Sequence, residues 1–137
     1  MSLTKVSFSM IQGAMANVLD YGADPTGATN SATAINAAIA DRRFVYFPAG
    51  TYLVNSPIDL KTYAAAGLYG VASEQVTIKA GAAMTGLINL YDTTDIYEGI
   101  SEYPIQNIKL DGNNLATYGI HVRYRHCLLY TSDAADE

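Results

Sequence analysis

The sequence of 137 residues has little of what several common protein classes require. One cysteine cannot form an internal disulfide, and with two histidines it does not suggest a metal site, so we expect no metal and no cofactor. Only 8 basic residues stand against 13 acidic ones, which disfavours nucleic-acid binding. No apolar run approaches the roughly 18 residues of a membrane span. Residues 1–7 lack the apolar core of a secretory signal. The length predicts a single domain. Because half of the residues are apolar, a packed core is also expected.

The last eleven residues, 127–137, differ in character from the rest of the chain. Their sequence, CLLYTSDAADE, resembles an in-frame translation of a transposase-type sequencing adapter. A segment of this kind is set aside before the fold is considered. Its removal takes away the single cysteine and three acidic residues, and the formal net charge changes from −5 to −2. We therefore expect residues 1–126 to be a truncated part of a longer protein, the alternative being an authentic acidic tail.

One segment carries the signals of an α-helix. Asn30 or Ser31 is a candidate N-cap, and Ala32–Ala40 is rich in alanine, the strongest helix former. Ile35 and Ile39 are four residues apart, so they lie on the same face. The sequence predicts one short amphipathic helix here.

The rest of the chain consists of short β-like runs and tight turns. A strand is predicted over 17–21, followed by a type I turn over Asp24–Gly27. Further strands are predicted over 44–47, 51–54, 58–60, 67–69, 76–78, 87–90, 105–110 and 120–122, with no helical period after residue 40. This pattern predicts an all-β sandwich, barrel or solenoid. The short strands and the corner-like Asp111–Asn114 favour a solenoid, whose open end the helix would cap.

Three motifs occur in a specific order and spacing: NVLDYGADPTG at 17–27, TAINAAI at 33–39 and VYFPAGTY at 45–52. Together they resemble the start of the pectate-lyase-like right-handed parallel β-helix family. IKLDGN at 108–113 with YGI at 118–120 is similar to a later coil. The resemblance implies an all-β, right-handed, single-stranded parallel β-helix with a short N-terminal capping α-helix. Residues 17–126 would form the cap and first coils, after a leader over 1–16.

The leader sequence KVSFSMIQGA at 5–14 resembles that of phage tail fibre and tailspike proteins with this fold. This implies a virion tail protein, a homotrimer at full length, that binds bacterial surface polysaccharide and in some cases depolymerises it. Residues 17–126 would then have a structural role. Two alternatives stay open: a secreted, cell-encoded polysaccharide lyase or glycoside hydrolase of the same fold, and a small sandwich-type binding module. No catalytic residue is transferred, because the family places its active residues on middle coils or between subunits.

The polar stretch between Leu90 and Ile105 contains the candidate sugar-binding residues. Glycoside hydrolysis needs two carboxylates about 5–9 Å apart, and sugar faces pack on aromatic rings. The alternative, which we favour, is a solvated insertion on one face of the solenoid. The candidates are Asp92, Asp95, Glu98 and Tyr97, with Glu102, Tyr91 and Tyr103 in the same stretch.

Three further sequence patterns give weaker signals. His121, Arg123 and Arg125 alternate with Val122 and Tyr124, which predicts a basic outer stripe and an apolar inner side. That stripe could meet an acidic polysaccharide, although an ordinary solvent face is the favoured interpretation.

Acidic residues surround the predicted cap at Asp20, Asp24 and Asp41, where turn and helix-end roles are expected rather than calcium binding. Residues 22–27 match the beginning of a phosphate-binding loop, G-x-x-x-x-G. Ala28 and Thr29 follow where that motif needs Lys and then Ser or Thr, so nucleotide binding is rejected.

Overall fold

The computed structural model describes residues 15–60, 63, 65–91, 101–123 and 127–131. The chain begins with β1 (Ala16–Asn17), the 3-10 helix η2 (Val18–Tyr21), β2 (Thr26–Asn30) and α1 (Ala32–Arg42). The remaining strands are β3 (Phe44–Phe47), β4 (Gly50–Val54), β5 (Ile58–Asp59), β6 (Gly67–Gly70), β7 (Val76–Ala80), β8 (Met84–Tyr91), β9 (Ser101–Gln106), β10 (Lys109–Asp111), β11 (Ala116–Arg123) and β12 (Cys127–Thr131). Among these elements no helix is long and apolar enough to cross a membrane.

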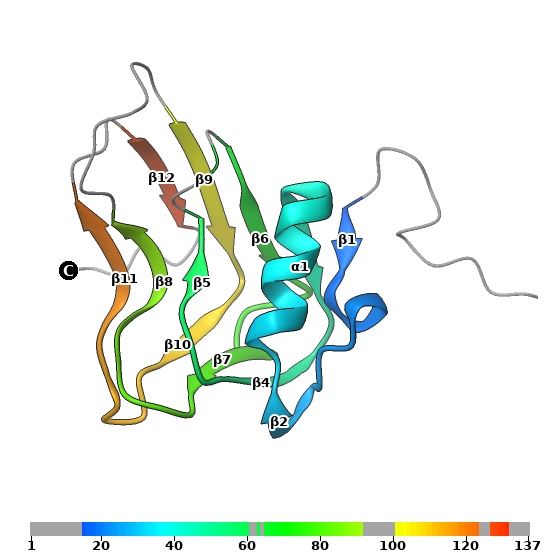
Figure 1. The fold of residues 1–137 in the computed structure, drawn as a ribbon. Helices are drawn as coiled ribbons and strands as arrows, with labels where there is room; N and C mark the ends of the chain where they lie inside the picture. The colour runs from blue at the N-terminus through cyan, green and yellow to red at the C-terminus, as the bar shows by residue number, and fades with distance from the viewer. Residues whose placement is uncertain (1–14, 61–62, 64, 92–100, 124–126, 132–137) are drawn as a thin grey trace, which may run out of the picture.

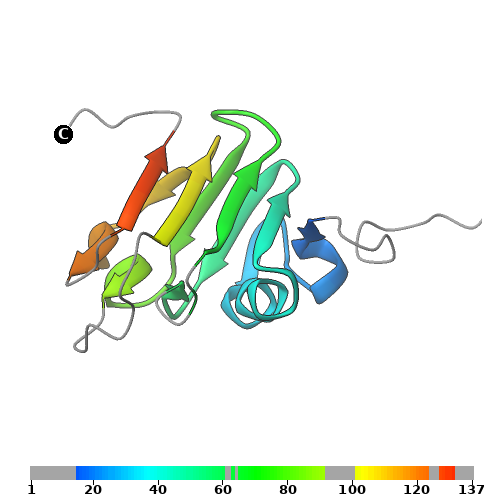
Figure 2. The same cartoon turned by 90° about the horizontal axis from the view of Figure 1, so that it is seen from above.

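The strands form three parallel sheets that wrap around one core (Figures 1 and 2). Sheet A has the order β1-β3-β6-β9-β12, sheet B the order β10-β7-β4-β2, and sheet C the order β11-β8-β5. Each complete coil supplies one strand to each sheet in turn: β3, β4 and β5, then β6, β7 and β8, then β9, β10 and β11. This is the repeating coil of a parallel β-helix, as the sequence predicts.

Inward-facing residues of successive coils stack in register. In sheet A, Val45, Leu68 and Ile105 occupy one column, and the first two are fully buried. In sheet C, Ile88 pairs with Ile58 below it and with Ile120 above it. Burying one such aliphatic side chain contributes about 1.5–3 kcal/mol. The columns therefore fix the register, because a slip by one residue would turn every apolar side chain outward.

Helix α1 covers the first coil, and the predicted helix is confirmed with two additional residues at its C-terminal end. Ile35 and Ile39 are fully buried. Asn36 Nδ2 donates to the carbonyl oxygen of Pro57 at 3.2 Å, and Asn36 Oδ1 accepts from the backbone N–H of Asp59 at 2.9 Å. Strand β5 is an edge strand of sheet C. The Asn36 amide thus supplies the bonds that a neighbouring strand would otherwise make.

The strand predicted over 17–21 is wrong beyond its first residue. Ala16 and Asn17 form β1, after which the chain enters η2. The Asn17 side chain accepts from the backbone N–H of Leu19 at 3.0 Å, and Gly22, at φ 95°, donates its N–H to the Leu19 carbonyl at 3.2 Å. These two caps stabilise a single helical turn over an extended strand.

The loop before α1 also differs in detail from the sequence prediction. Thr26 and Gly27 of the expected turn already lie in strand β2, which was not predicted. The helix begins after Ser31, whose side chain makes no capping bond to it. Asn30 Oδ1 instead accepts from the backbone N–H of Ala32 at 3.1 Å and of Asn55 at 2.9 Å. Asn30 therefore ties the start of the helix to the end of β4.

The single strand predicted over 105–110 is two strands, β9 and β10. Asn107 adopts φ 58° between them, a left-handed conformation that asparagine tolerates better than most residues. The chain turns there from sheet A into sheet B. The other seven segments predicted as strands after the helix each overlap an observed strand.

Strand β12 pairs with β9 through residues 127–131, inside the segment that was set aside as adapter-like. This pairing does not test where the segment comes from, and the adapter origin of 127–137 stays a prediction.

Candidate functional site

The residues singled out from the sequence as sugar-binding candidates, Asp92, Asp95, Tyr97 and Glu98, lie outside the described residues. Tyr103, from the same stretch, is described, and its ring is fully buried. Its hydroxyl donates to the backbone carbonyl of Tyr63. Tyr103 therefore belongs to the core and cannot present its face to a sugar, because β9 directs this position inward.

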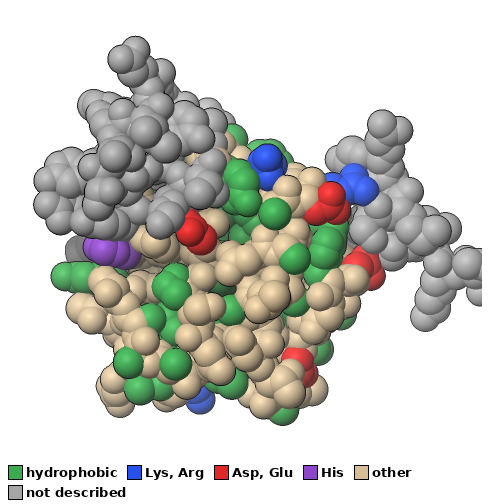
Figure 3. All heavy atoms as spheres, viewed as in Figure 1, with side chains coloured by type: hydrophobic (Ala, Val, Ile, Leu, Met, Phe, Trp, Pro, Cys, Tyr) green, Lys and Arg blue, Asp and Glu red, His purple; other side chains and the backbone are tan. Residues whose placement is uncertain are grey.

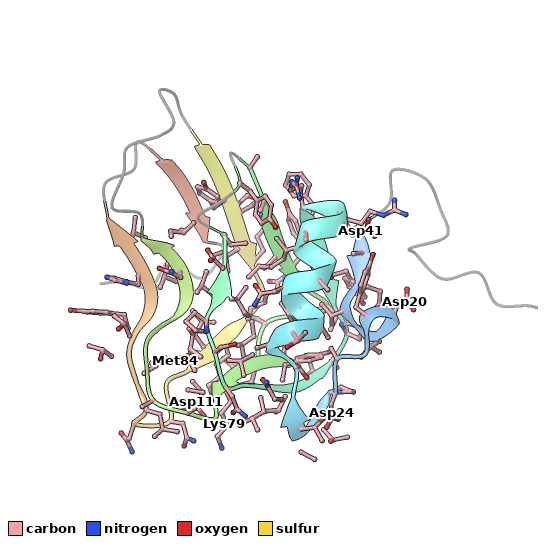
Figure 4. The ribbon with its side chains drawn as sticks, viewed as in Figure 1. Asp20, Asp24, Asp41, Lys79, Met84 and Asp111 are labelled. Carbon is pink, nitrogen blue, oxygen red and sulfur yellow. The ribbon has the colours of Figure 1, made fainter. Side chains whose placement is uncertain are left out.

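A groove with a volume of about 610 Å³ lies instead beside sheet C. Four of its lining residues lie on β8 and one on β11, and Figure 4 labels Met84 at the beginning of β8. Its lining residues are Pro57, Ala83, Met84, Thr85, Gly86, Asn89 and His121.

Strand alternation explains why Asn89 and His121 point away from the core. Asn89 pairs with Asp59 on β5 and with His121 on β11, one position along from the inward isoleucine column. Because successive strand residues face opposite sides of a sheet, this neighbouring column is directed outward. The same registers that build the core therefore align three polar side chains along the outside of sheet C.

Gly86 keeps the two groove-forming strands close together. A Cβ at this position would lie 2.7 Å from the Cβ of His121, closer than real side chains approach. Any larger residue would force His121 to move. The glycine therefore allows His121 to approach β8 closely and adds no side chain to the lining of the groove.

An aromatic pair stands at one side of the groove. The rings of Tyr118 and His121 are stacked, with centroids 5.5 Å apart and planes inclined by 14°. Tyr118 is 53% exposed, the largest exposed fraction among the large hydrophobic residues described. Aromatic faces contact apolar C–H surfaces, and the hydroxyl of Thr85 and the amide of Asn89 can donate and accept hydrogen bonds. The arrangement suits a ligand that carries both apolar faces and hydroxyl groups.

The basic stripe predicted on β11 is only partly described, and its apolar side is not buried. His121 lies in the groove, but Val122 is 41% exposed. Strand β11 is an edge strand of sheet C, so Val122 is covered by β8 on one side only. The side chain of Arg123, and Arg125 as a whole, lie outside what the structure describes.

Asp20, Asp24 and Asp41 do not converge on one point, and Figure 4 shows them apart on η2, near β2 and at the C-terminal end of α1. Hydrogen bonds from the hydroxyl and N–H of Thr26, and from those of Thr29, hold the pKa of Asp24 well below its usual range. In the described part of the chain no three His, Cys, Asp or Glu residues are grouped as a metal site would require. The contacts of Asp24 with Thr26 and Thr29 are the turn role expected from the sequence.

Asp41 has a helix-end role. It accepts a hydrogen bond from the Tyr21 hydroxyl and lies 3.6 Å from the Arg42 side chain. The bond to Asp41 is the main reason why the pKa of Tyr21 is raised. It fastens η2 to the end of α1, so two elements of the cap are held together.

Sequence reasoning missed most of the groove. His121 was the single lining residue that it singled out, while Met84, Thr85 and Gly86 fell before the predicted strand 87–90. A partial signal was present, because an aromatic residue at 118 stands three positions before His121. The pairing of Tyr118 with Gly86 and of His121 with Asn89 depends on strand register, which the sequence does not show.

Two curated fungal proteins are similar to part of the chain. A non-secreted LysM effector, LysM19 of Penicillium expansum, is 38% identical over 97 residues, covering 61% of this chain and 7% of its own length. A glucan 1,3-beta-glucosidase of Cochliobolus carbonum is 35% identical over 86 residues, covering 52% and 11% respectively. The chain therefore spans about a tenth or less of these relatives.

Solved structures share the fold at low sequence identity. ORF18 of Geobacillus virus E2 gives a TM-score of 0.66 at 24% identity, over 77% of this chain and 22% of that one. The A-module of the mannuronan C-5 epimerase AlgE4 of Azotobacter vinelandii gives 0.60 at 24% identity, over 77% and 31%. PfbA, a surface adhesin of Streptococcus pneumoniae, gives 0.55 at 21% identity, over 86% and 33%.

The family comparison covers the whole capped coil region. The model of the rhamnogalacturonase A/epimerase, pectate lyase-like family matches residues 15–126, from the start of β1 to just before β12. The match includes α1, every strand from β1 to β11 and every residue that lines the groove. With its all-β coil and short capping helix, the chain belongs to the rhamnogalacturonase A/epimerase, pectate lyase-like family.

Proposed function

We propose that the chain forms the N-terminal cap and first coils of a phage or prophage tail fibre or tailspike protein that binds bacterial surface polysaccharide. Residues 1–16 are its leader and residues 17–126 its cap and coils. The parent acts as a homotrimer in the virion tail. Similarity of the fold to a Geobacillus virus protein and to a bacterial surface adhesin supports this proposal.

The observation that carries the structural role is the closure of one end of the coil by α1. Ile35 and Ile39 cover the apolar interior, and Asn36 bonds to the free edge of β5. An open coil end exposes both strand edges and apolar core, which favours association with other chains. Because α1 covers the apolar core and bonds to a strand edge, this region is the sealed end from which a longer binding shaft extends.

Gene context and binding together test the proposal. We expect the gene to lie among tail genes, and the full-length protein to deplete purified surface polysaccharide of the host bacterium from solution. An antibody raised against the 137-residue chain should label virion tails in electron micrographs. Location among sugar-uptake genes, with unlabelled virions and no polysaccharide bound, would contradict the proposal.

A second candidate is a cell-encoded, secreted polysaccharide lyase or glycoside hydrolase. It is favoured by the similarity to a glucan 1,3-beta-glucosidase and to the A-module of a mannuronan C-5 epimerase. Release of oligosaccharides by the full-length protein would show catalysis in either setting, and the unsaturated sugar formed by a lyase would distinguish it from a hydrolase. Catalysis combined with sugar-uptake neighbours would select this second candidate.

A further inference from the structure

We propose that the groove beside sheet C binds an uncharged pyranose unit of a glycan chain, with the face of the sugar against the Tyr118–His121 pair. This inference rests on the proposed function and assigns it a site within the first three coils. Four observations carry it: the groove itself, the stacked aromatic pair, the composition of the lining and the absence of a side chain at Gly86.

The composition of the lining points to an uncharged ligand. None of the seven lining residues, all within the described part of the chain, is Asp, Glu, Lys or Arg. A uronate or a phosphorylated sugar requires a cationic partner to replace the water that it loses on binding. A neutral sugar requires hydrogen-bonding groups, and Thr85, Asn89 and His121 provide them. Figure 3 shows charged side chains sparse and scattered on the face viewed there.

The aromatic pair matches the flat, apolar face of a pyranose ring. The two rings are stacked with planes inclined by only 14°, so each covers part of one face of the other, and an outer face of the pair is left for a sugar. Tyr118 is more than half exposed, whereas Tyr103 is fully buried. Tyr118 stacks on His121, which itself lines the groove, so the pair offers an aromatic contact at the side of the groove.

The room for a sugar depends on Gly86 and on the apolar residues around it. The volume of about 610 Å³ lies within the usual range for small-molecule sites. Pro57, Ala83 and Met84 add apolar contacts for the C–H groups at the edge of a sugar. A methyl group at position 86 would meet His121 and displace one half of the aromatic pair.

The test is saturation-transfer NMR on the 137-residue chain with neutral and acidic oligosaccharides of equal length. The neutral ligands are laminarihexaose, cellohexaose and maltohexaose, and the acidic ligand is hexagalacturonate. We expect at least one neutral oligosaccharide to bind, and to bind more tightly than hexagalacturonate. No binding of any neutral oligosaccharide, or preference for hexagalacturonate over all of them, would overturn the inference.

Variants locate the binding. Tyr118→Ala should weaken binding of the preferred neutral oligosaccharide about tenfold, the loss expected for one aromatic contact. Tyr46→Ala is the matched control, because it removes a half-buried tyrosine from sheet A, away from the groove. Thr85→Val, which removes a hydroxyl at an exposed position without changing the size of the side chain, should weaken binding severalfold. Melting curves check that each variant is folded.

Two outcomes separate this inference from the function on which it rests. If the full-length protein binds surface polysaccharide and both Tyr118→Ala and Thr85→Val leave oligosaccharide affinity unchanged, the groove assignment is wrong while the proposed function stands. If the full-length protein binds no polysaccharide at all, the proposed function itself fails.

Discussion

The two outer strands of sheet C meet very different surroundings. Strand β5 lies next to α1, and its Ile58 is fully buried. Strand β11 is the edge strand at the other side of the sheet, where Val122 and Tyr118 are largely exposed. Ile58 and Ile120 belong to the same inward column, yet Ile120 is only half-buried. Burial in a solenoid therefore depends on the neighbouring coil as much as on the residue, and at β5 a helix replaces that coil.

The sharpest test of this comparison is truncation along the isoleucine column. Ile88→Ala should reduce the free energy of unfolding by about 2–5 kcal/mol, since it leaves a cavity between two coils. Ile120→Ala should cost less than half of that, because this residue already contacts water. Urea denaturation of both variants measures the difference, and equal losses would show that the edge strand β11 is as well covered as the central strand β8.

Replacing the capping amide should have the next largest effect. Asn36→Leu removes the partners of the Asp59 N–H and the Pro57 carbonyl, and leaving such groups unsatisfied costs about 1–3 kcal/mol. Ala37→Leu, on the exposed face of the same helix, should change stability by no more than about 0.5 kcal/mol. Thermal unfolding of the two variants provides the comparison. A loss of stability at position 36 no larger than that at position 37 would contradict the role of α1 as a substitute for a neighbouring strand.

A smaller effect is expected where the chain leaves η2. Gly22 adopts φ 95°, and a Cβ there would meet nothing within 4 Å. The cost of Gly22→Ala is therefore one of backbone conformation alone, about 1–2 kcal/mol. Chemical denaturation measures it, and a neutral or stabilising result would show that η2 can end without a left-handed residue.

The smallest expected effect is a pH dependence of stability that arises from Asp24 in the loop before α1. The pKa of Asp24 is lowered in the folded chain, so its ionised form adds stability above the unfolded value of about 3.9, and this is lost as the pH falls through the lower folded value. Asp24→Asn should flatten the fall of the melting temperature at acid pH. Thr29→Val, which removes one hydroxyl donor to Asp24, should flatten it in part. An unchanged acid profile in both variants would contradict this account.

Much of the fold could be predicted because coil strands bury apolar residues at alternate positions. The run Phe44–Phe47 and the run Val76–Ile78 carry that signal, and both form strands. Strand β2, with the sequence TGATN, contains no large apolar residue and is mostly exposed, so it gave no signal. The segment 17–21 was misassigned because Asn17 and Gly22 cap a helical turn, an effect of two polar contacts rather than of periodicity.

The groove could not be predicted, since its residues meet only through the register of different coils. Gly86 and His121 are far apart in the sequence, and their contact follows from the pairing of β8 with β11. Asn89 looked like an ordinary polar residue within a predicted strand. The candidates chosen for their carboxylates, Asp92, Asp95 and Glu98, fall in the part of the chain that is not described, and their role stays a prediction.

Native-state hydrogen exchange of individual amides tests most directly the claim that α1 completes the first coil as a strand would. We expect the Asp59 amide, bonded to Asn36, to be protected to a degree similar to the amides of β8, and to lose that protection selectively in Asn36→Leu. Exchange of Asp59 at the rate of an unprotected amide in the unchanged protein, or equal protection with and without Asn36, would contradict the account.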